Sequence, residues 1–404
     1  MLKRTMQPVI KKISKMFPVI LLTGMRQVGK STLFDLMKES GRKYVSLDNF
    51  EDRQLAKTNP ALFIERYSPP VIIDEIQYAP ELFSYIKIYV DSHKKDGDFW
   101  LTGSQKYELM KGVTESLAGR VAILDLLGLS YKEIIKKPLD SKPFIPSMSM
   151  MKLNSKPRKL MDIYKMILDG FYPRLVVHKG ENRDNFYKSY LQSYIERDVR
   201  NDLNIRGNEL KFNDFIRSAA IRTGTILNYA DISKEVAIDQ RTAKTWLSVL
   251  ERSGIVKLLE PYYKNPSNII TKTPKLYFLD TGLCSYLAKM NSPEILEAGY
   301  MNGRILETYV FAEILKSYWH NGKEPNIYFY RDKEQREIDF VIEEGGVLYP
   351  IEVKKTANPA ISDAKNFWLL NQFKLKVGTG TVICLRSSPL PLNENTLALP
   401  VWEI

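Results

Sequence analysis

The stretch GMRQVGKSTLF, from Gly24 to Phe34, follows the apolar run Pro18–Leu22. Gly24 and Gly29 enclose four residues and are followed by Lys-Ser, which is the G-x-x-x-x-G-K-[ST] spacing of a phosphate-binding loop. The apolar run before it predicts a strand, and the residues after it predict a helix. This context disfavours a chance glycine loop, because the motif requires a strand before it and a helix after it.

The residue types in this loop suit a nucleotide phosphate. Glycines let backbone N–H groups turn toward phosphate oxygens, and the start of the following helix adds its dipole. Lys30 would reach the terminal phosphates, and Ser31 would ligate magnesium. We therefore expect ATP and Mg²⁺ as cofactors. The expected nucleotide-binding residues of the loop are Gly24, Met25, Arg26, Gln27, Val28, Gly29, Lys30, Ser31 and Thr32.

A second motif, VIIDEIQ, places Asp74 and Glu75 at the end of an apolar run. Open parallel sheets hold their ligands at the carboxyl ends of their strands. We expect Asp74 to hold magnesium through water and Glu75 to polarise the water that attacks the terminal phosphate. A charged pair that only caps a strand is the alternative, and the preceding phosphate loop argues against it.

Two further motifs follow, FWLTGS and SLAGR. Ser104, or Thr102 beside it, is a candidate polar sensor between the carboxylates and the terminal phosphate. The motifs GMRQVGKS, VIIDEIQ, LTGSQ and LAGR, in this order, resemble the bacterial and archaeal ATPases of the AAA+ superfamily, over roughly residues 1–140. The resemblance implies a catalytic arginine, often supplied by a neighbouring subunit, and Arg120 is the candidate. A structural arginine is the alternative, and serine stands at the sensor position where the superfamily commonly has asparagine.

The pattern of apolar runs predicts an α/β fold class with several domains. Short runs alternate with amphipathic stretches in the first third, which predicts a parallel sheet wrapped by helices. The expected strands are Val19–Leu22, Tyr44–Leu47, Val71–Ile73, Phe99–Leu101 and Val121–Leu127. A stretch rich in Pro, Ser and Lys, from about Lys136 to Lys159, predicts a linker or mobile connection. The expected domains are residues 1–140 (AAA+ P-loop ATPase domain), 141–205 (linker and helical segment), 206–290 (winged helix) and 291–404 (nuclease-like).

The middle region is expected to be helical from Leu160 to Leu203 and then to form a winged helix. Tyr229–Val236 and Arg241–Arg252 resemble a helix-turn-helix, and Ile255–Tyr263 resembles the strand of a wing. An apolar stripe on the second helix leaves Arg241, Lys244, Thr245 and Ser248 on the outer face, where they would reach a DNA backbone. A winged helix used only for packing or protein contact is the alternative. YLQSYIERDVRNDL and KLYFLDTGL resemble the companion segment of these ATPases, a domain of unknown function.

The last region carries acidic residues in a pattern that resembles the PD-(D/E)xK nuclease family, which implies a restriction-endonuclease-like α/β domain. They are Glu307 in GRILETYVFAEIL, Asp339 in EIDFVIEE, and Glu352 with Lys354 in LYPIEVKK. The three carboxylates would bind one or two magnesium ions, and the lysine would stabilise hydroxide or the transition state.

A two-residue turn at Gly345-Gly346 would place Asp339 directly opposite Glu352, with Lys354 on the same face and Glu307 approaching from the preceding helix. A degenerate nuclease fold retained as a binding scaffold is the alternative.

Composition narrows the function classes. The chain has 404 residues, two cysteines (Cys284 and Cys384) and three histidines, which excludes a disulfide framework or a four-cysteine zinc site. The basic start lacks the apolar core of a signal peptide, so we expect a cytoplasmic protein with no membrane segment. The net charge of +12 is compatible with a polyanionic partner. We expect a Mg-dependent ATPase acting on DNA, with homo-oligomerisation if Arg120 acts in trans. A nucleotide-dependent switch or scaffold that binds a protein is the alternative.

Overall fold

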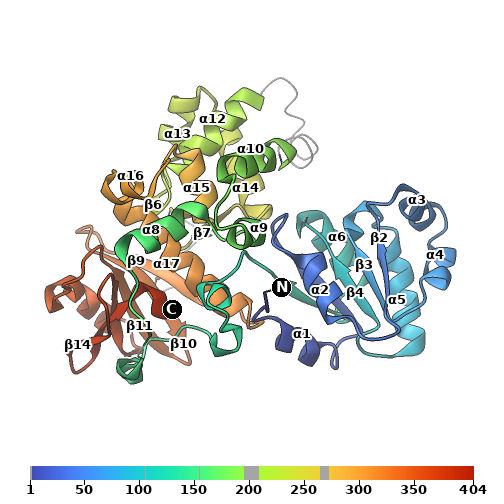
Figure 1. Cartoon of the computed structure of the whole chain (residues 1–404), viewed down its shortest axis with the longest axis horizontal. Coiled ribbons are helices and arrows are strands. Elements are labelled where there is room, and N and C mark those ends of the chain that lie inside the picture. Colours follow the sequence, from blue (N-terminus) through green and yellow to red (C-terminus); the bar gives the residue numbers. More distant parts are fainter. Residues whose placement is uncertain (1, 105, 154, 195–208, 264–272) are drawn as a thin grey trace.

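The strands of the chain form three sheets. The computed structural model describes residues 2–104, 106–153, 155–194, 209–263 and 273–404. A five-stranded sheet belongs to the N-terminal part, a three-stranded sheet to the middle part and a seven-stranded sheet to the C-terminal part. In Figure 1 the N-terminal part lies on the right, the C-terminal sheet at the lower left, and the mostly helical middle part above.

The N-terminal sheet is parallel, with strand order β2-β3-β4-β1-β5. Its strands are β1 (Val19–Thr23), β2 (Lys43–Ser46), β3 (Val71–Asp74), β4 (Phe99–Thr102) and β5 (Val121–Asp125). Every residue of β1, β3 and β4 is buried, as expected for strands covered by helices on both faces. The predicted parallel sheet is confirmed. Because the strands run the same way, the residues after β1, β3 and β4 meet at one edge.

Helices surround this sheet. They are α1 (Gln7–Ile13), α2 (Lys30–Met37), α3 (Phe50–Thr58), α4 (Pro60–Arg66), the 3₁₀ helix η1 (Ile76–Tyr78), α5 (Leu82–His93), α6 (Lys106–Ser116) and α7 (Tyr131–Ile134). Local capping fixes several starts: the side chain of Asn49 accepts from the N–H groups of Glu51 and Asp52, and Ser130 with Glu133 forms a capping box.

The connection over residues 136–159 is anchored, which contradicts the expectation of a mobile segment. It contains η2 (Pro138–Asp140) and η3 (Met148–Lys152). Phe144 is buried, and its backbone N–H donates to Ser317 Oγ at 3.0 Å while its carbonyl accepts from the Tyr318 hydroxyl at 3.2 Å. Phe144 and the partly buried apolar residues Ile145, Met148, Met150 and Met151 therefore hold the connection against the core.

The middle part is helical with a small antiparallel sheet of order β6-β8-β7. Its elements are α8 (Leu160–Asp169), α9 (Pro173–Val177), α10 (Arg183–Tyr194), α12 (Glu209–Ala220), β6 (Thr225–Ile226), α13 (Tyr229–Val236), α14 (Gln240–Arg252), β7 (Val256–Leu259), β8 (Lys275–Phe278), α15 (Thr281–Leu287) and α16 (Pro293–Ala298). The predicted pair of helices is present as α13 and α14. The part of the predicted helical region from residue 195 to 203 lies outside the described residues.

The C-terminal part begins with the buried helix α17 (Asn302–Trp319). The strands that follow are β9 (Ile327–Arg331), β10 (Glu337–Glu344), β11 (Val347–Val353), β12 (Lys376–Val377), β13 (Gly380–Cys384), β14 (Leu390–Asn393) and β15 (Thr396–Pro400), with η6 (Ile361–Ala364), η7 (Phe367–Gln372) and η8 (Val401–Glu403) between and after them. The sheet order is β14-β15-β13-β11-β10-β9, with β12 beside β11. β9, β10 and β11 are antiparallel, whereas β13 runs parallel to β11.

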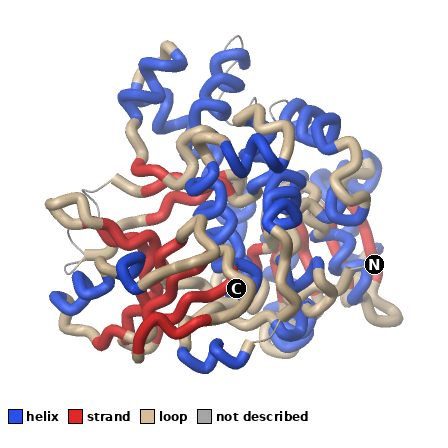
Figure 2. The backbone as a smooth tube through the Cα atoms, turned by 60° about the vertical axis from the view of Figure 1, so that its left-hand side comes forward, coloured by secondary structure: helices blue, strands red, loops and turns tan. Residues whose placement is uncertain are grey.

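Backbone contacts join the middle and C-terminal parts. The N–H of Tyr262 donates to the Phe329 carbonyl at 2.7 Å, and the N–H of Phe329 donates to the Glu260 carbonyl at 3.1 Å. Helices lie between the C-terminal sheet and the N-terminal sheet in the rotated view of Figure 2. None of the helices in the described ranges has the length and apolar character needed to cross a lipid bilayer.

Candidate functional site

Steric constraints define the loop between β1 and α2. Gly24 has φ +139°, and a Cβ there would lie 2.1 Å from the Leu126 carbonyl oxygen. Gly29 has φ +92° and precedes the first residue of α2. Both motif glycines therefore occupy positions that other residues fill only with strain or collision.

The loop is closed on itself by Lys30. The lysine is buried, and its Nζ donates to the carbonyls of Gly24 at 3.0 Å and Met25 at 2.8 Å. The ammonium thus lies over the loop, where bound phosphates would compete with these carbonyls for it. Among the other expected loop residues, Met25 and Val28 are buried, Arg26 is half-buried, and Gln27 and Thr32 are exposed.

Asp74 collects hydroxyl groups from three neighbouring elements. Ser31 Oγ donates to its Oδ1 at 2.7 Å, the Thr102 hydroxyl donates to the same oxygen, and Tyr44 Oη donates to Oδ2 at 3.0 Å. The donors come from α2, β4 and β2, whose ends meet at the same edge of the sheet. Tyr44 was not predicted. Burial, followed by the charge of Asp74, raises the pKa of the Tyr44 phenol well above its usual value, so Tyr44 stays a donor.

Glu75 adopts a left-handed backbone conformation with φ +56°. Its N–H donates to the Thr102 hydroxyl at 3.3 Å, and its Oε2 accepts from the side-chain amide of Gln77 and, at 3.5 Å, from Ser104 Oγ. The structure therefore brings the expected general base and the expected sensor Ser104 together. Gln77 is the last residue of the motif VIIDEIQ, but no role was predicted for it.

Arg120 lies away from this edge. Its carbonyl accepts from the N–H of Val19, the first residue of β1, so it occupies the edge of the sheet opposite the loop. Its guanidinium forms a two-point ion pair with Asp91, at 2.5 and 3.0 Å. Arg120 therefore does not reach the phosphate loop of its own chain. If it has the predicted catalytic role, it acts on a neighbouring subunit.

The middle part of the chain packs over the loop between β1 and α2. A Cβ at Gly254 would lie 3.2 Å from Met25 Cγ, and the Tyr172 hydroxyl lies 3.7 Å from Met25 Sδ. A cavity of about 100 Å³ lies between the N-terminal part and the middle part. Its lining includes Gly24, Met25, Ser104 and Asp125 from the first and residues of the segment 251–257 from the second. The segment that ends α14 and follows it therefore lies close to the phosphate loop.

A second cluster gathers the predicted acidic residues of the C-terminal part. β10 and β11 pair from Glu344 with Val347 to Phe340 with Ile351, as the Gly345-Gly346 turn predicts. The regular pairing of β10 with β11 ends at Phe340 and Ile351, so Asp339 and Glu352 lie outside it, in contrast to the predicted pair. The register of β10 against β9 also shifts between Ile338 and Val341. Asp339 Oδ2 instead accepts the backbone N–H of Val353 at 2.8 Å.

The acidic residues nevertheless converge. Lys354 Nζ donates to Glu352 Oε1 at 2.7 Å. Burial, followed by the charges of Glu307 and Glu352, raises the pKa of Asp339 well above its usual value. Burial likewise raises the pKa of Glu352, against the opposing charge of Lys354. Glu352 Oε2 is buried and has no hydrogen-bond partner within the described ranges.

A buried lysine from the middle part completes this cluster. Lys275 Nζ lies 3.1 Å from Glu307 Oε1 and 2.6 Å from Glu337 Oε1, and the Tyr277 hydroxyl also donates to Glu307, at 2.5 Å. Burial would lower the pKa of Lys275, but Glu307, Asp339 and Glu337 raise it, so the lysine is charged. Sequence reasoning missed this residue, because it reaches the cluster from a different part of the chain.

The expected set of three metal-binding carboxylates, Glu307, Asp339 and Glu352, stays a prediction. No group of three or more His, Cys, Asp or Glu side chains within the described ranges is arranged to hold a metal ion. Lys275 supplies positive charge to Glu307 in place of a metal. Asp339 and Glu352 remain as hard oxygen ligands, and the orphaned Glu352 oxygen suits a cation.

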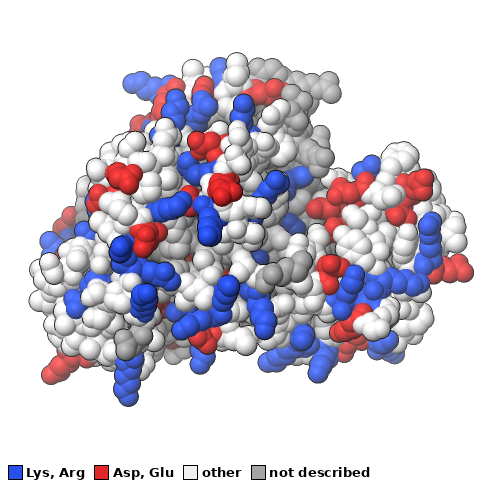
Figure 3. Space-filling view, viewed as in Figure 1, with Lys and Arg blue, Asp and Glu red and all other residues white. Residues whose placement is uncertain are grey.

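The outer face of α14 agrees with the helix-turn-helix prediction. Ala243, Trp246, Leu247 and Leu250 are buried, whereas Arg241, Lys244, Thr245 and Ser248 are exposed. On the face shown in Figure 3, Lys and Arg are interspersed with Asp and Glu over the middle and C-terminal parts and do not form one continuous patch. The net positive charge alone thus marks no nucleic-acid surface on this face.

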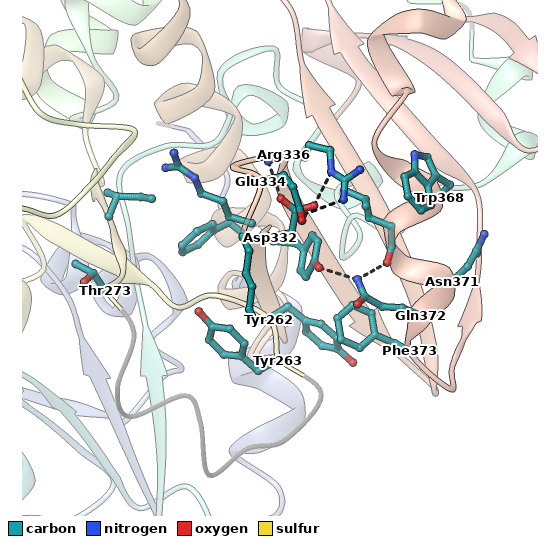
Figure 4. A pocket seen from close by; sticks show the side chains of 16 residues that line it. Tyr262, Tyr263, Thr273, Asp332, Glu334, Arg336, Trp368, Asn371, Gln372 and Phe373 are labelled. Atoms are coloured by element: carbon teal, nitrogen blue, oxygen red, sulfur yellow. Dashed lines mark hydrogen bonds and ion pairs between the residues drawn. The ribbon is translucent and has the colours of Figure 1, made fainter.

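A cavity of about 1160 Å³ is lined by the residues that follow β7, by the end of β9 with the turn after it, and by η7 (Figure 4). Tyr262 and Phe373 meet edge to face in its lining, with ring centroids 4.9 Å apart. At its rim Arg336 is held by Asp332 at 2.6 Å and by Glu334 at 3.1 Å. The arginine charge is therefore offset within the lining itself.

Each of the three parts of the chain matches a different protein family. Residues 16–135 match the family described as AAA domain, whereas residues 160–294 and 302–404 match two families described as domains of unknown function, DUF8612 and DUF4143. The N-terminal part is therefore an AAA+ P-loop ATPase-like domain. The expectations of a winged helix and a nuclease-like domain receive no support from these families.

Two curated relatives resemble most of the chain. An uncharacterized protein of Mycobacterium tuberculosis is 25% identical over 389 residues, which are 96% of this chain and 81% of the relative. An uncharacterized protein of Methanocaldococcus jannaschii is 26% identical over 352 residues, which are 82% of this chain and 73% of the relative.

Solved structures with similarity include AMPPCP-bound DnaA from Aquifex aeolicus, at 16% identity and a TM-score of 0.31, covering 61% of this chain and 85% of that chain. A single-residue variant of RuvB from Thermotoga maritima has 16% identity and a TM-score of 0.30, covering 63% of this chain and 89% of that chain.

Proposed function

We propose that the protein is a magnesium-dependent ATPase whose nucleotide state acts on its middle and C-terminal parts. The observation that carries this proposal is the 2.7 Å hydrogen bond from Ser31 Oγ to Asp74 Oδ1. It places a hydroxyl and a carboxylate, both oxygen ligands that magnesium prefers, beside a glycine loop closed by a buried lysine.

Ser31 and Asp74 would hold the ion, directly and through water. When bound, Mg²⁺ neutralises charge on the nucleotide phosphates. Lys30 exchanges the carbonyls of Gly24 and Met25 for phosphate oxygens. Glu75 accepts the proton of the attacking water, because its carboxylate lies at the same strand-end edge as Asp74.

Phosphate release from ATP by the purified full-length chain tests this proposal. Turnover that requires magnesium and stops on chelation supports it. If the protein binds the nucleotide with magnesium but does not hydrolyse it, the protein is a nucleotide-dependent switch and not an enzyme.

We further propose that the coupled half acts on DNA. The order of α12, β6, α13, α14, β7 and β8 supports a winged helix, with the exposed Arg241, Lys244, Thr245 and Ser248 facing a DNA backbone. The contact between Gly254 and Met25 gives a physical route from the nucleotide to α14. Fluorescence anisotropy of labelled duplex DNA, with ATP or ADP present, tests this coupling.

A second candidate activity is phosphodiester cleavage at the C-terminal cluster. The succession α17, β9, β10, β11 and then β13 parallel to β11 supports a nuclease-like fold. The orphaned Glu352 oxygen favours a bound cation, held by Asp339 and Glu352. That ion would supply a nucleophilic hydroxide and offset charge on the scissile phosphate.

Cleavage assays separate this activity from the alternative of a scaffold that binds a protein partner. Plasmid and single-stranded DNA are incubated with Mg²⁺ or Mn²⁺, with and without ATP. Cleavage that is lost in Asp339→Asn and Lys354→Ala supports a nuclease. Intact DNA under all of these conditions favours the scaffold, in which the ion pairs of Lys275 and Lys354 serve only to hold the fold.

A further inference from the structure

A glutamine beside the proposed general base makes contacts that its local structure does not require. Gln77 lies in η1, which has three residues, and its side-chain amide donates to Glu75 Oε2. The same Nε2 lies 3.5 Å from Ser104 Oγ, which itself lies 3.5 Å from Glu75 Oε2. Three polar side chains thus form a closed triangle.

This triangle borders the phosphate loop. Ser104 lines the cavity that also contains Gly24 and Met25, whereas Thr102, two residues earlier, donates to Asp74. Ser104, which contacts Glu75, and Thr102, which contacts Asp74, therefore come from the same strand end. A group bound over the loop would meet Ser104 and its two partners.

The second polar atom of Gln77 is unsatisfied. Its Oε1 is buried and has no hydrogen-bond partner within the described ranges. A Cβ at Gly103 would lie 2.6 Å from this oxygen, so glycine leaves the room that the amide occupies. A buried acceptor without a donor is costly, so the side chain keeps this position at the expense of its carbonyl group.

The backbone of Glu75 is also consistent with a functional constraint. A non-glycine residue at φ +56° is strained, and such strain persists where the surrounding structure holds it. The conformation turns the Glu75 carboxylate toward Gln77 while its N–H bonds to Thr102. Thr102 thus holds the backbone of Glu75, and Gln77 and Ser104 hold its carboxylate.

We propose that Gln77 is a positioning residue for ATP hydrolysis: its amide N–H group holds the carboxylate of Glu75 in the orientation in which Glu75 accepts the proton of the attacking water. This inference rests on the proposed ATPase function. In that reaction the water oxygen bonds to the terminal phosphorus, the bond to the leaving oxygen of ADP breaks, and Glu75 takes the proton. Gln77 exchanges no atom.

The test compares Gln77→Leu, which keeps the size of the side chain and removes both polar atoms, with Gln54→Leu, an exposed glutamine on α3. In Gln77→Leu we expect kcat to fall at least tenfold, with the Kd for a fluorescent ATP analogue within twofold of wild type and the Tm unchanged. Gln54→Leu should behave as wild type.

A second variant, Gln77→Glu, keeps an acceptor and loses the donor. We expect the acid limb of its kcat–pH profile to move to higher pH, because two adjacent carboxylates retain a proton more readily than one. If Gln77→Leu does not fold, Gly103→Ala displaces the same amide together with the Leu109 side chain, and it should lower kcat in the same way.

An unchanged kcat in Gln77→Leu, or a raised one, overturns the inference and leaves the ATPase proposal standing. A parallel loss of analogue binding and Tm would also overturn it, since this is the result of a structural role. Absence of turnover in the wild-type protein would instead overturn the ATPase proposal itself.

Discussion

Ser31 Oγ lies 2.7 Å from Asp74 Oδ1, so a hydrogen bond joins the first turn of α2 to the end of β3. The two residues are brought together by the strand order, which places β4 between β1 and β3. The Thr102 hydroxyl on β4 binds the same carboxylate oxygen and bridges that gap. A magnesium ion would enter an existing arrangement of oxygen ligands and would not have to assemble one.

Lys30→Ala should abolish ATP turnover, with at least a hundredfold loss expected when the loop lysine is removed. The lysine is buried and bonds two loop carbonyls, so we also expect a loss of about 1–2 kcal/mol in the free energy of unfolding. Phosphate release and chemical denaturation measure the two effects. Lys38→Ala, at an exposed position on the same domain, is the control. Unchanged hydrolysis in Lys30→Ala would contradict the ATPase assignment.

Glu75→Gln should bind ATP and hydrolyse it far more slowly. The amide keeps the shape and the contacts to Gln77 and Ser104 in part, but it cannot accept the proton of the attacking water. Single-turnover kinetics measure hydrolysis separately from nucleotide affinity. Loss of nucleotide binding would show that Glu75 serves the structure of the loop edge.

Mixing Arg120→Ala with Glu75→Gln protein tests action between subunits. Arg120 is remote from its own loop and paired with Asp91, so it can meet a phosphate only on a neighbouring copy. Each variant alone should be inactive, and the mixture should regain part of the activity, because some interfaces combine an intact arginine with an intact glutamate. Absence of rescue, with co-assembly verified by mass photometry, would make Arg120 a structural partner of Asp91.

The sequence predicted those features of the fold and site that depend on local patterns. The five parallel strands, the loop with its two constrained glycines, and the buried and exposed faces of α14 follow from spacing along a short stretch. The anchored connection was not predicted, because its apolar residues are scattered among Pro, Ser and Lys and follow no helix or strand period.

The residues that were missed depend on tertiary pairing. Tyr44 reaches Asp74 because β2 pairs with β3, and Lys275 reaches Glu307 because the middle sheet meets the C-terminal helix. Lys275 and Tyr277 lie in KLYFLDTGL, a stretch that suggested family resemblance and gave no chemical pattern. Short-range spacing carries no information on such contacts.

Stability should fall as the pH is lowered from 6.5, because of His320. This histidine is fully buried at the junction with the N-terminal part, and burial lowers its pKa to about 3. The negative charge of Glu133 raises the pKa, whereas the positive charges of Arg4 and Lys316 lower it further. A folded-state pKa below the unfolded value means that the unfolded chain binds the extra proton between these two pH values.

The expected slope is therefore about 1.4 kcal/mol of unfolding free energy per pH unit below 6.5 from this group alone. Urea denaturation at pH 7 and pH 5.5 measures it, and His320→Gln should flatten the dependence. His93→Gln, at an exposed histidine on α5, is the control. A slope that is unchanged in His320→Gln would show that other groups govern the acid response.

Lys275→Met tests whether the C-terminal cluster can bind a metal. The substitution keeps the length of the buried side chain and removes the ammonium that lies 3.1 Å from Glu307 and 2.6 Å from Glu337. Removing one member of a buried ion-pair set leaves uncompensated carboxylates, so we expect a loss of about 3–5 kcal/mol in stability. Thermal unfolding without divalent ions measures this loss.

Addition of Mg²⁺ or Mn²⁺ should then restore part of the Tm of Lys275→Met, because the cation would take the place of the ammonium between Glu307 and Glu337 and beside Asp339. Lys323→Met, at an exposed lysine, should show neither the loss nor the recovery. A double variant that adds Asp339→Asn should lose the metal response, which ties the recovery to this cluster and separates it from any metal effect at Ser31 and Asp74. Failure of both ions to raise the Tm of Lys275→Met would mean that these carboxylates hold the fold by ion pairing, as the scaffold alternative requires.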